Sequence, residues 1–169
     1  TGQPHFVSKT CLEKGIPCYN VRSVNTPTSR SIIADFSPDL LLSFSCPYRI
    51  YPKTLAIPRI GCLNVHSSLL PAYAGVGTYV HVLADGLSAT GVTVHEMVEE
   101  FDAGKIVAQQ QIAIDPNTST CALFAKQCRT AGNLLVSVVR DTLAHDEIHG
   151  TQQDITLRSY CGEPQASDI

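Results

Sequence analysis

The sequence predicts an α/β domain with a mostly parallel central sheet. Strand-like apolar runs alternate with segments of helical character, which is the order of elements in such domains. The run at residues 39–44 is largely apolar, as strands are when both faces of a parallel sheet are covered. A length of 169 residues fits one domain that buries a sizeable core. With 44% hydrophobic and 16% charged residues, the composition excludes a disordered chain.

The first half of the chain alternates short predicted elements with proline and glycine breaks. Gly15 and Pro17 stop the first helix, and Thr28 or Ser29 caps the second. Pro38 disfavours a helical residue before it, so the second helix ends there. The expected elements are a helix over residues 5–13, a short strand over 17–21, a helix over 30–35, strands over 39–44 and 61–65, and an irregular stretch over 46–58.

The second half predicts a hairpin between two helices. Gly86 closes the first of these helices, and Ser119 or Thr118 caps the second, longer one. The connection between the two strands is too short for a crossover helix, so we expect them to pair antiparallel. The expected elements are a helix over residues 78–85, strands over 91–98 and 106–114 joined by a turn at 101–104, and a helix from 119 to 143.

Charge and cysteine usage narrow the class of protein. The net charge of −3 and a pI near 6.0 provide no strong basic field that would attract nucleic acid. The 7 cysteines are odd in number and form no C-x-x-C pair, which indicates free thiols in a reducing compartment. We see no signal peptide and no apolar run long enough to span a membrane. We therefore expect a cytoplasmic protein.

Two polar side chains lie at the end of the strand predicted over residues 61–65. Asn64 and His66 are two positions apart, so on a strand they point to the same face. A carboxylate, Asp102, follows in a later turn. If it lies against His66, it stabilises the imidazolium, and we expect the pKa of His66 to be raised above its usual value. Open α/β sheets place their active sites where strands end. An amide donor, an imidazole and a carboxylate can together transfer an acyl group to an amine without a metal.

Each of these residues also has a plain structural explanation. A single histidine often has all its hydrogen bonds satisfied in a core, and Asn64 could serve only backbone groups at a strand end. We interpret His81, in a helix, and His95, in a strand, as structural. The spacings of Cys62, His66 and His95 match no zinc-ligand pattern, so we expect no metal.

The order of motifs also resembles a known family. The matching pieces are Asn64-x-His66 followed by x-Ser-Leu-Leu-Pro, Tyr73-x-Gly75, Thr-Gly-Val-Thr at residues 90–93, and Asp102-x-Gly104. Together they resemble the folate-dependent formyltransferases, from about residue 36 to residue 143. That family includes glycinamide ribonucleotide formyltransferase, the catalytic domain of methionyl-tRNA formyltransferase and sugar N-formyltransferases. The resemblance implies a Rossmann-like, three-layer fold.

The resemblance also implies roles for specific residues. Asn64, His66 and Asp102 would be catalytic, and the formyl donor would be 10-formyltetrahydrofolate, with no metal. In the family, the loop after the central strand and the turn before the aspartate hold the pterin ring of the folate. The corresponding cofactor-binding candidates are Tyr48, Arg49, Ile50, Glu99, Glu100 and Phe101. A surface loop is the alternative for the first three.

The acceptor implied by the resemblance is a primary amine, preferably on an amino sugar or another small molecule. Residues 90–114 resemble amino-sugar formyltransferases, and Ala74 stands where the family often has a basic residue that would contact phosphate. Methionyl-tRNA is the less favoured acceptor, a glycinamide-type nucleotide is also open, and a membrane partner is not expected. A hydrolase that transfers the formyl group of the folate to water is a third alternative.

A non-catalytic fragment is the alternative from another class of protein. The family's first strand unit, with its acceptor loop, has no counterpart in the sequence, so we expect a chain truncated relative to the family. The expected organisation is a catalytic domain over residues 1–145 and a polar tail or linker over 146–169. The sequence makes no prediction of oligomeric state.

Overall fold

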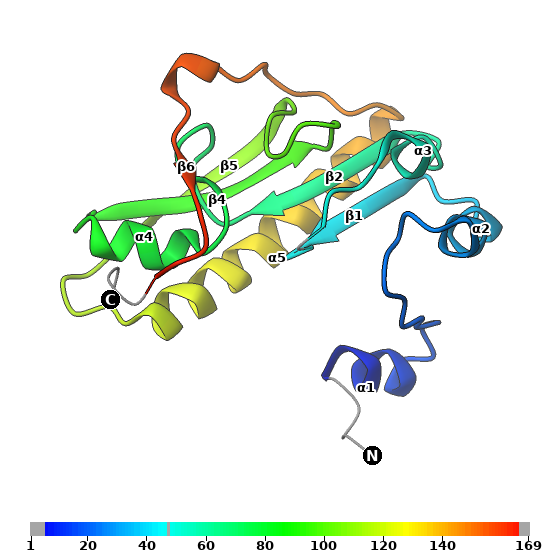
Figure 1. Ribbon diagram of the computed structural model, residues 1–169, viewed down its shortest axis with the longest axis horizontal. Helices are drawn as coiled ribbons and strands as arrows, with labels where there is room; N and C mark the ends of the chain where they lie inside the picture. Colours follow the sequence, from blue (N-terminus) through cyan, green and yellow to red (C-terminus); the bar gives the residue numbers. More distant parts are fainter. Residues whose placement is uncertain (1–5, 47, 166–169) are drawn as a thin grey trace.

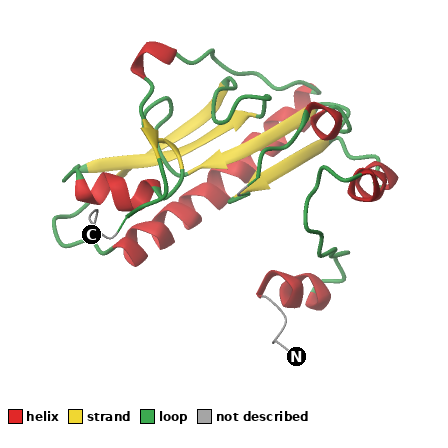
Figure 2. Cartoon of the chain, viewed as in Figure 1, coloured by secondary structure: helices red, strands yellow, loops and turns green. Residues whose placement is uncertain are grey.

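The computed structural model describes residues 6–46 and 48–165, so the predicted helix start at His5 lies outside the described residues. A four-stranded sheet in the order β1-β2-β4-β5 forms the centre, with the long helix of residues 120–145 along one face and the first helix, residues 6–13, away from the sheet (Figures 1 and 2). The sheet strands are β1 (Leu40–Phe44), β2 (Gly61–His66), β4 (Ala89–Glu96) and β5 (Ile106–Ala113). The helices are α1 (Phe6–Glu13), α2 (Pro27–Asp35), α3 (Pro52–Leu55), α4 (Thr78–Ala84) and α5 (Thr120–His145).

The long helix α5 covers one face of the sheet (Figure 1). Its start is fixed by the predicted cap, since the Ser119 side chain accepts a hydrogen bond from the Ala122 amide. Leu123 and Val138 of this helix pack with Leu63 and Val94 of the sheet in one buried cluster. Burial of this apolar surface is the main force that holds β2 and β4, and with them the strand ends, in place.

The α/β class is confirmed, but the sheet is less parallel than the sequence predicts. Within the four-stranded sheet, β1 with β2 is the one parallel pairing among the described residues, and β2–β4 and β4–β5 are antiparallel. The antiparallel hairpin of β4 and β5 is as expected. The prediction for β1 is wrong in burial: it is an edge strand of the described sheet, with Leu42 and Phe44 46% and 45% exposed.

Smaller elements differ from the prediction in the first half of the chain. Residues 17–21 form no strand, and the stretch predicted as irregular contains the short helix α3, which begins at Pro52. Proline fits the first helical position because its fixed φ suits the helix and its missing N–H would be unpaired there. For the same reason α2 begins at Pro27, with Thr26 as its cap, one turn earlier than expected.

The chain after α5 does not extend away from the sheet. It runs back along the β4–β5 hairpin, orange to red in Figure 1, and Thr151 forms an antiparallel bridge with Ile106. A 3₁₀ turn (Ile155–Leu157) leads into β6 (Tyr160–Cys161), which pairs in parallel with β3 (Ala74–Gly75). The division of the chain at residue 145 stays a prediction. No helix in the described part of the chain is long and apolar enough to cross a bilayer.

Candidate active site

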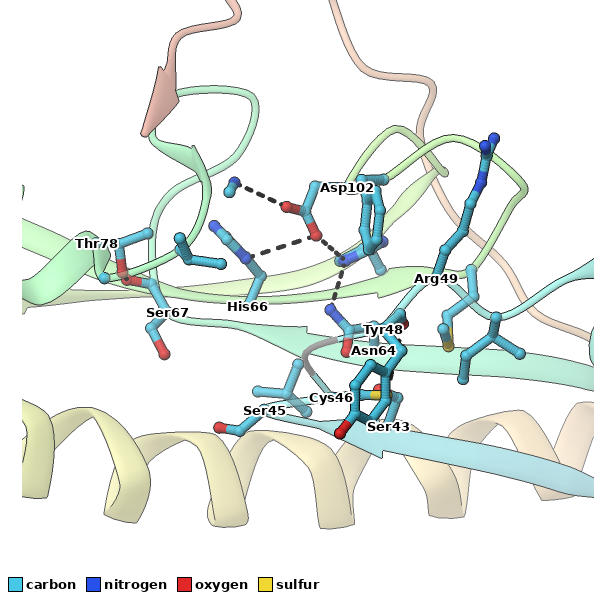
Figure 3. A pocket seen from close by; sticks show the side chains of 18 of the residues that line it. Ser43, Ser45, Cys46, Tyr48, Arg49, Asn64, His66, Ser67, Thr78 and Asp102 are labelled. Atoms are coloured by element: carbon cyan, nitrogen blue, oxygen red, sulfur yellow. Dashed lines mark hydrogen bonds and ion pairs between the residues drawn. The ribbon is translucent and has the colours of Figure 1, made fainter. Parts of the chain in front are cut away.

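A cavity of about 520 Å³ opens where the central strands end (Figure 3). Its walls come from the ends of β1, β2 and β4, from the turn after β4, and from the start of α4. All nine predicted site residues line this cavity. They are Asn64, His66 and Asp102, and Tyr48, Arg49, Ile50, Glu99, Glu100 and Phe101. The fold therefore gathers residues from three separate segments of the sequence into one space.

The amide of Asn64 is held by a histidine on the neighbouring strand. The antiparallel register of β2 and β4 places Asn64 directly opposite His95. The Nδ1–H of His95 donates to the Glu96 carbonyl oxygen at 2.8 Å, so its Nε2 accepts from Asn64 Nδ2 at 3.1 Å. An amide group has two N–H donors, and one remains for a ligand in the cavity.

His66 lies at the end of β2 with only 6% of its surface exposed. Its Nε2–H donates to the Tyr73 carbonyl oxygen at 2.7 Å, and its Nδ1 lies 3.6 Å from Oδ1 of Asp102 (Figure 3). Burial lowers the pKa of His66 below its usual value, and Asp102 and the Tyr73 carbonyl only partly oppose this effect. The sequence predicts a raised pKa from the aspartate alone. That prediction is wrong, because the cost of desolvation is larger than the attraction.

Asp102 lies between two histidines and a backbone amide. Its Oδ2 accepts from the Gly75 amide at 2.9 Å, and its Oδ1 lies 3.5 Å from Nε2 of His95 as well as near His66. Burial raises the pKa of this carboxyl, but the contacts with His95, His66 and Gly75 outweigh it, so the pKa lies below its usual value. Asp102 is therefore a carboxylate at neutral pH.

The backbone of the Asp102 turn has little freedom. Asp102 itself has a φ of +51°, in the left-handed region that aspartate tolerates better than most residues. Two residues on, a Cβ at Gly104 would collide with the Glu96 carbonyl oxygen, so the turn packs directly against the end of β4. Only glycine permits this close approach.

The outer wall of the cavity is more exposed. Arg49 bridges its two sides, because its Nε donates to the Glu99 carbonyl oxygen at 2.8 Å. Tyr48 and Phe101 are 54% and 49% exposed, which leaves aromatic surface free to contact a flat ligand. Ile50 is buried and supports the loop from behind. Glu100 pairs with Arg158 at 2.6 Å.

Two parts of the site are not predicted from the sequence. His95, interpreted as structural, joins Asn64 and Asp102 within it. Tyr160, Gly162 and Glu163, in the segment expected to be a tail, line the cavity. The strand pairings that bring these residues in leave no local signal in the sequence. His81 has a structural contact, since it bonds the Gly162 carbonyl oxygen at 3.1 Å.

Comparison with known proteins identifies the family of the chain. Residues 2–139 match the family described as Formyl transferase. A methionyl-tRNA formyltransferase of Thermotoga neapolitana is 34% identical over 166 residues, which is 98% of this chain and 53% of that protein. The chain thus spans about half the length of the curated relative that it matches.

Solved structures of this fold are similar over most of the chain. An N-formyltransferase from Helicobacter canadensis, in complex with folinic acid and dTDP-3-aminofucose, aligns with a TM-score of 0.73 at 18% identity, covering 95% of this chain and 54% of that one. Phosphoribosylglycinamide formyltransferase from Bacillus halodurans aligns with a TM-score of 0.69 at 22% identity, covering 76% and 70%. The match over residues 2–139 and the 34% identity place the chain in the formyl transferase family.

Proposed function

We propose that the chain catalyses the transfer of a formyl group from 10-formyltetrahydrofolate to a primary amine. The observation that carries the proposal is the meeting of Asn64, His66 and Asp102 at the inner wall of one cavity. The outer wall of that cavity holds the aromatic and polar residues expected to bind the folate. Membership of the formyl transferase family supports the choice of reaction.

His66 is the proposed general base. The amine nitrogen attacks the formyl carbon and must lose a proton, and a histidine whose pKa is lowered by burial is neutral and free to accept it. The imidazolium that forms is stabilised by the Asp102 carboxylate at 3.6 Å and by the Tyr73 carbonyl at 2.7 Å. The same proton can then go to the folate nitrogen as the bond to the formyl carbon breaks.

Asn64 is the proposed donor to the formyl oxygen. That oxygen gains negative charge as the amine attacks, and an amide N–H can stabilise it without titrating. One N–H of the Asn64 side chain is fixed by His95, so the direction of the other is set before the substrate arrives. A donor that is already oriented need not reorganise during the reaction.

The proposed donor site is the outer part of the cavity. The folate ring system is flat and would stack on Tyr48 or Phe101, and its polar edge would meet backbone groups of the two loops that Arg49 joins. A folinic acid complex of the Helicobacter canadensis protein supports a folate-type donor for this fold. The chemistry needs no metal ion.

Two acceptors are supported by different observations. We propose a small molecule, such as an amino sugar, because the Helicobacter canadensis protein binds an aminofucose nucleotide. Methionyl-tRNA is the second candidate, since the 34% identical relative is a methionyl-tRNA formyltransferase. The two acceptors would give different formylated products through the same chemistry at His66.

The test is a formyl transfer assay of the protein with radiolabelled 10-formyltetrahydrofolate. Amino sugar nucleotides, methionyl-tRNA and water alone are supplied in parallel, and formylated amine and free formate are measured. Formylation of an amino sugar supports the proposal, and formylation of methionyl-tRNA supports the second candidate. Formate release that is rapid without any amine would instead identify a hydrolase. Folate that neither binds nor reacts would identify a non-catalytic chain.

A further inference from the structure

We propose that Gln153 positions Asp102 for catalysis, so that the segment after α5 is part of the working site. This inference rests on the proposed function for the catalytic role of Asp102, whereas the contacts between Gln153 and the Asp102 turn do not depend on it. Gln153 lines no part of the cavity and touches no reacting atom. Its role would be to hold the turn from which the Asp102 carboxylate projects.

The side-chain amide of Gln153 donates two hydrogen bonds to the Asp102 turn. Its Nε2 donates to the carbonyl oxygens of Asp102 at 2.8 Å and of Gly104 at 2.7 Å. The side chain is only 7% exposed, so water does not readily replace these bonds. Both protons of one amide nitrogen are thus used on a single turn about 50 residues away in the sequence.

The same segment also acts on the carboxylate. Strand β6 pairs with β3, where the Ala74 amide donates to the Ser159 carbonyl at 2.9 Å and the Val76 amide donates to the Cys161 carbonyl at 3.1 Å. Between these bonds lies Gly75, whose amide donates to Oδ2 of Asp102 at 2.9 Å. The segment therefore fixes the backbone of Asp102 directly and its side chain through Gly75.

The turn needs such support because its conformation is unusual. Asp102 has a φ of +51°, which costs free energy in a residue with a side chain. Gly104 packs on the other side against the Glu96 carbonyl. Without the Gln153 bonds, two buried carbonyls would lose their donor, and the turn would relax toward solvent to recover hydrogen bonds.

The pKa of His66 reports the position of the Asp102 carboxylate. The groups that face His66 are Asp102, the Tyr73 carbonyl and His95, and those that face Asp102 are His66, His95 and the Gly75 amide. The Asp102 charge raises the pKa of His66 against the lowering by burial. If the turn relaxes and the carboxylate moves away, the titration midpoint of His66 should fall.

The experiment compares Gln153→Met with Gln109→Met in the full chain. Methionine keeps the length of glutamine but has no N–H donor. Gln109 is exposed, but it is a control for the loss of an amide with two bonds, because its Nε2 donates to the Leu70 carbonyl at 2.8 Å and to Thr93 Oγ1 at 2.9 Å, outside the cavity. The measurements are thermal melting, the NMR titration of His66, and kcat and KM for formyl transfer.

We expect Gln153→Met to lower both the His66 midpoint and kcat, the latter by about tenfold, because a misplacement of about 1 Å can cost up to about a hundredfold. KM for the folate should change by less than about twofold, since the outer wall is untouched. Gln109→Met should lower only the melting temperature. Gln153→Asn keeps the donors on a shorter side chain and should be intermediate.

Two outcomes would overturn the inference. One is a Gln153→Met protein with a lowered melting temperature that, when measured well below that temperature, has the same His66 titration and kcat as the wild type. If Gln153→Met does not fold, Gln153→Asn with wild-type titration and kcat is the other. The titration needs no substrate, so a chain that transfers no formyl group would refute the proposed function while the positioning of Asp102 is still decided.

Discussion

The two ends of the cavity are built in opposite ways. At the inner end, His66, His95 and Asp102 are 6%, 2% and 9% exposed, and each is bonded to other protein groups. At the outer end, Tyr48 and Phe101 are about half exposed, and the Arg49–Glu99 ion pair lies in solvent at 3.7 Å. The inner end is therefore fixed before a ligand binds, whereas the outer end can adapt to one.

This difference separates two kinds of interaction with a substrate. A preorganised group that acts on developing charge lowers the barrier itself, and its loss appears in kcat. A flexible, solvated contact holds the substrate and the transition state equally, and its loss appears in KM. Substitutions at the inner end should accordingly reduce kcat, and those at the outer end should raise KM for the folate.

The largest effect is expected for His66→Ala. It removes the proposed base, so kcat should fall by about a hundredfold or more. KM for the folate should stay within about twofold, because the outer wall is unchanged. His149→Ala is the control, since this exposed histidine lies outside the cavity lining. Turnover of His66→Ala close to that of the control would break the assignment of chemistry to the inner end.

Asp102→Asn should give the next largest effect, a loss in kcat of about tenfold to a hundredfold. His66 must be neutral to accept a proton, so the acid limb of kcat/KM lies at the His66 pKa. Burial places that limb below the usual value of about 6.5. Asparagine removes the charge that raises this pKa, so the limb should move to still lower pH.

The pH profile of kcat/KM checks this prediction, since it reports ionisation of the free enzyme. Asp85→Asn is a control of equal charge change, because Asp85 bonds the Tyr73 hydroxyl at 2.6 Å and is outside the cavity lining. An acid limb that rises or stays fixed in Asp102→Asn would mean that the carboxylate does not face His66 in solution.

Much of the inner end could be predicted from sequence because it lies on a strand. Asn64 and His66 share a face by the alternation of a strand, which needs no tertiary information. The Ser119 cap and the hairpin of β4 and β5 were likewise local signals. Residues 17–21 have the composition of a strand, but no strand in the described part of the chain pairs with them, and they are irregular.

The rest of the site depends on contacts between segments that are distant in the sequence. His95 enters the site only because β2 and β4 are antiparallel, which sets it opposite Asn64, and a mostly parallel sheet would have placed it elsewhere. The segment around Gln153 is polar, as a tail would be, yet it is tied down by hydrogen bonds to backbone carbonyls. Neither polarity nor periodicity encodes such bonds. The pKa of His66 was predicted in the wrong direction for the same reason, since its burial is a tertiary property.

His95→Leu should give an intermediate effect. Leucine fills the buried space but cannot accept from Asn64, so the amide loses its fixed direction. One hydrogen bond of this kind corresponds to a loss in kcat of about tenfold, with KM for the folate unchanged. His95→Gln offers an acceptor oxygen and should recover part of the rate. Equal kcat in the two variants would show that the contact with His95 does not orient Asn64.

The smallest effect is expected at the outer end, for Arg49→Gln. The Arg49–Glu99 pair is exposed, and such pairs contribute little to stability, so the melting temperature should not change. Loss of the bridge between the two loops should raise KM for the folate about threefold, with kcat unchanged. Arg59→Gln is the matched control, because Arg59 pairs with Asp39 and Asp146, both at 2.6 Å, away from the cavity and should leave KM unaltered. If Arg49→Gln instead lowered kcat at constant KM, the outer wall would act in the transition state, and the separation of the two ends would fail.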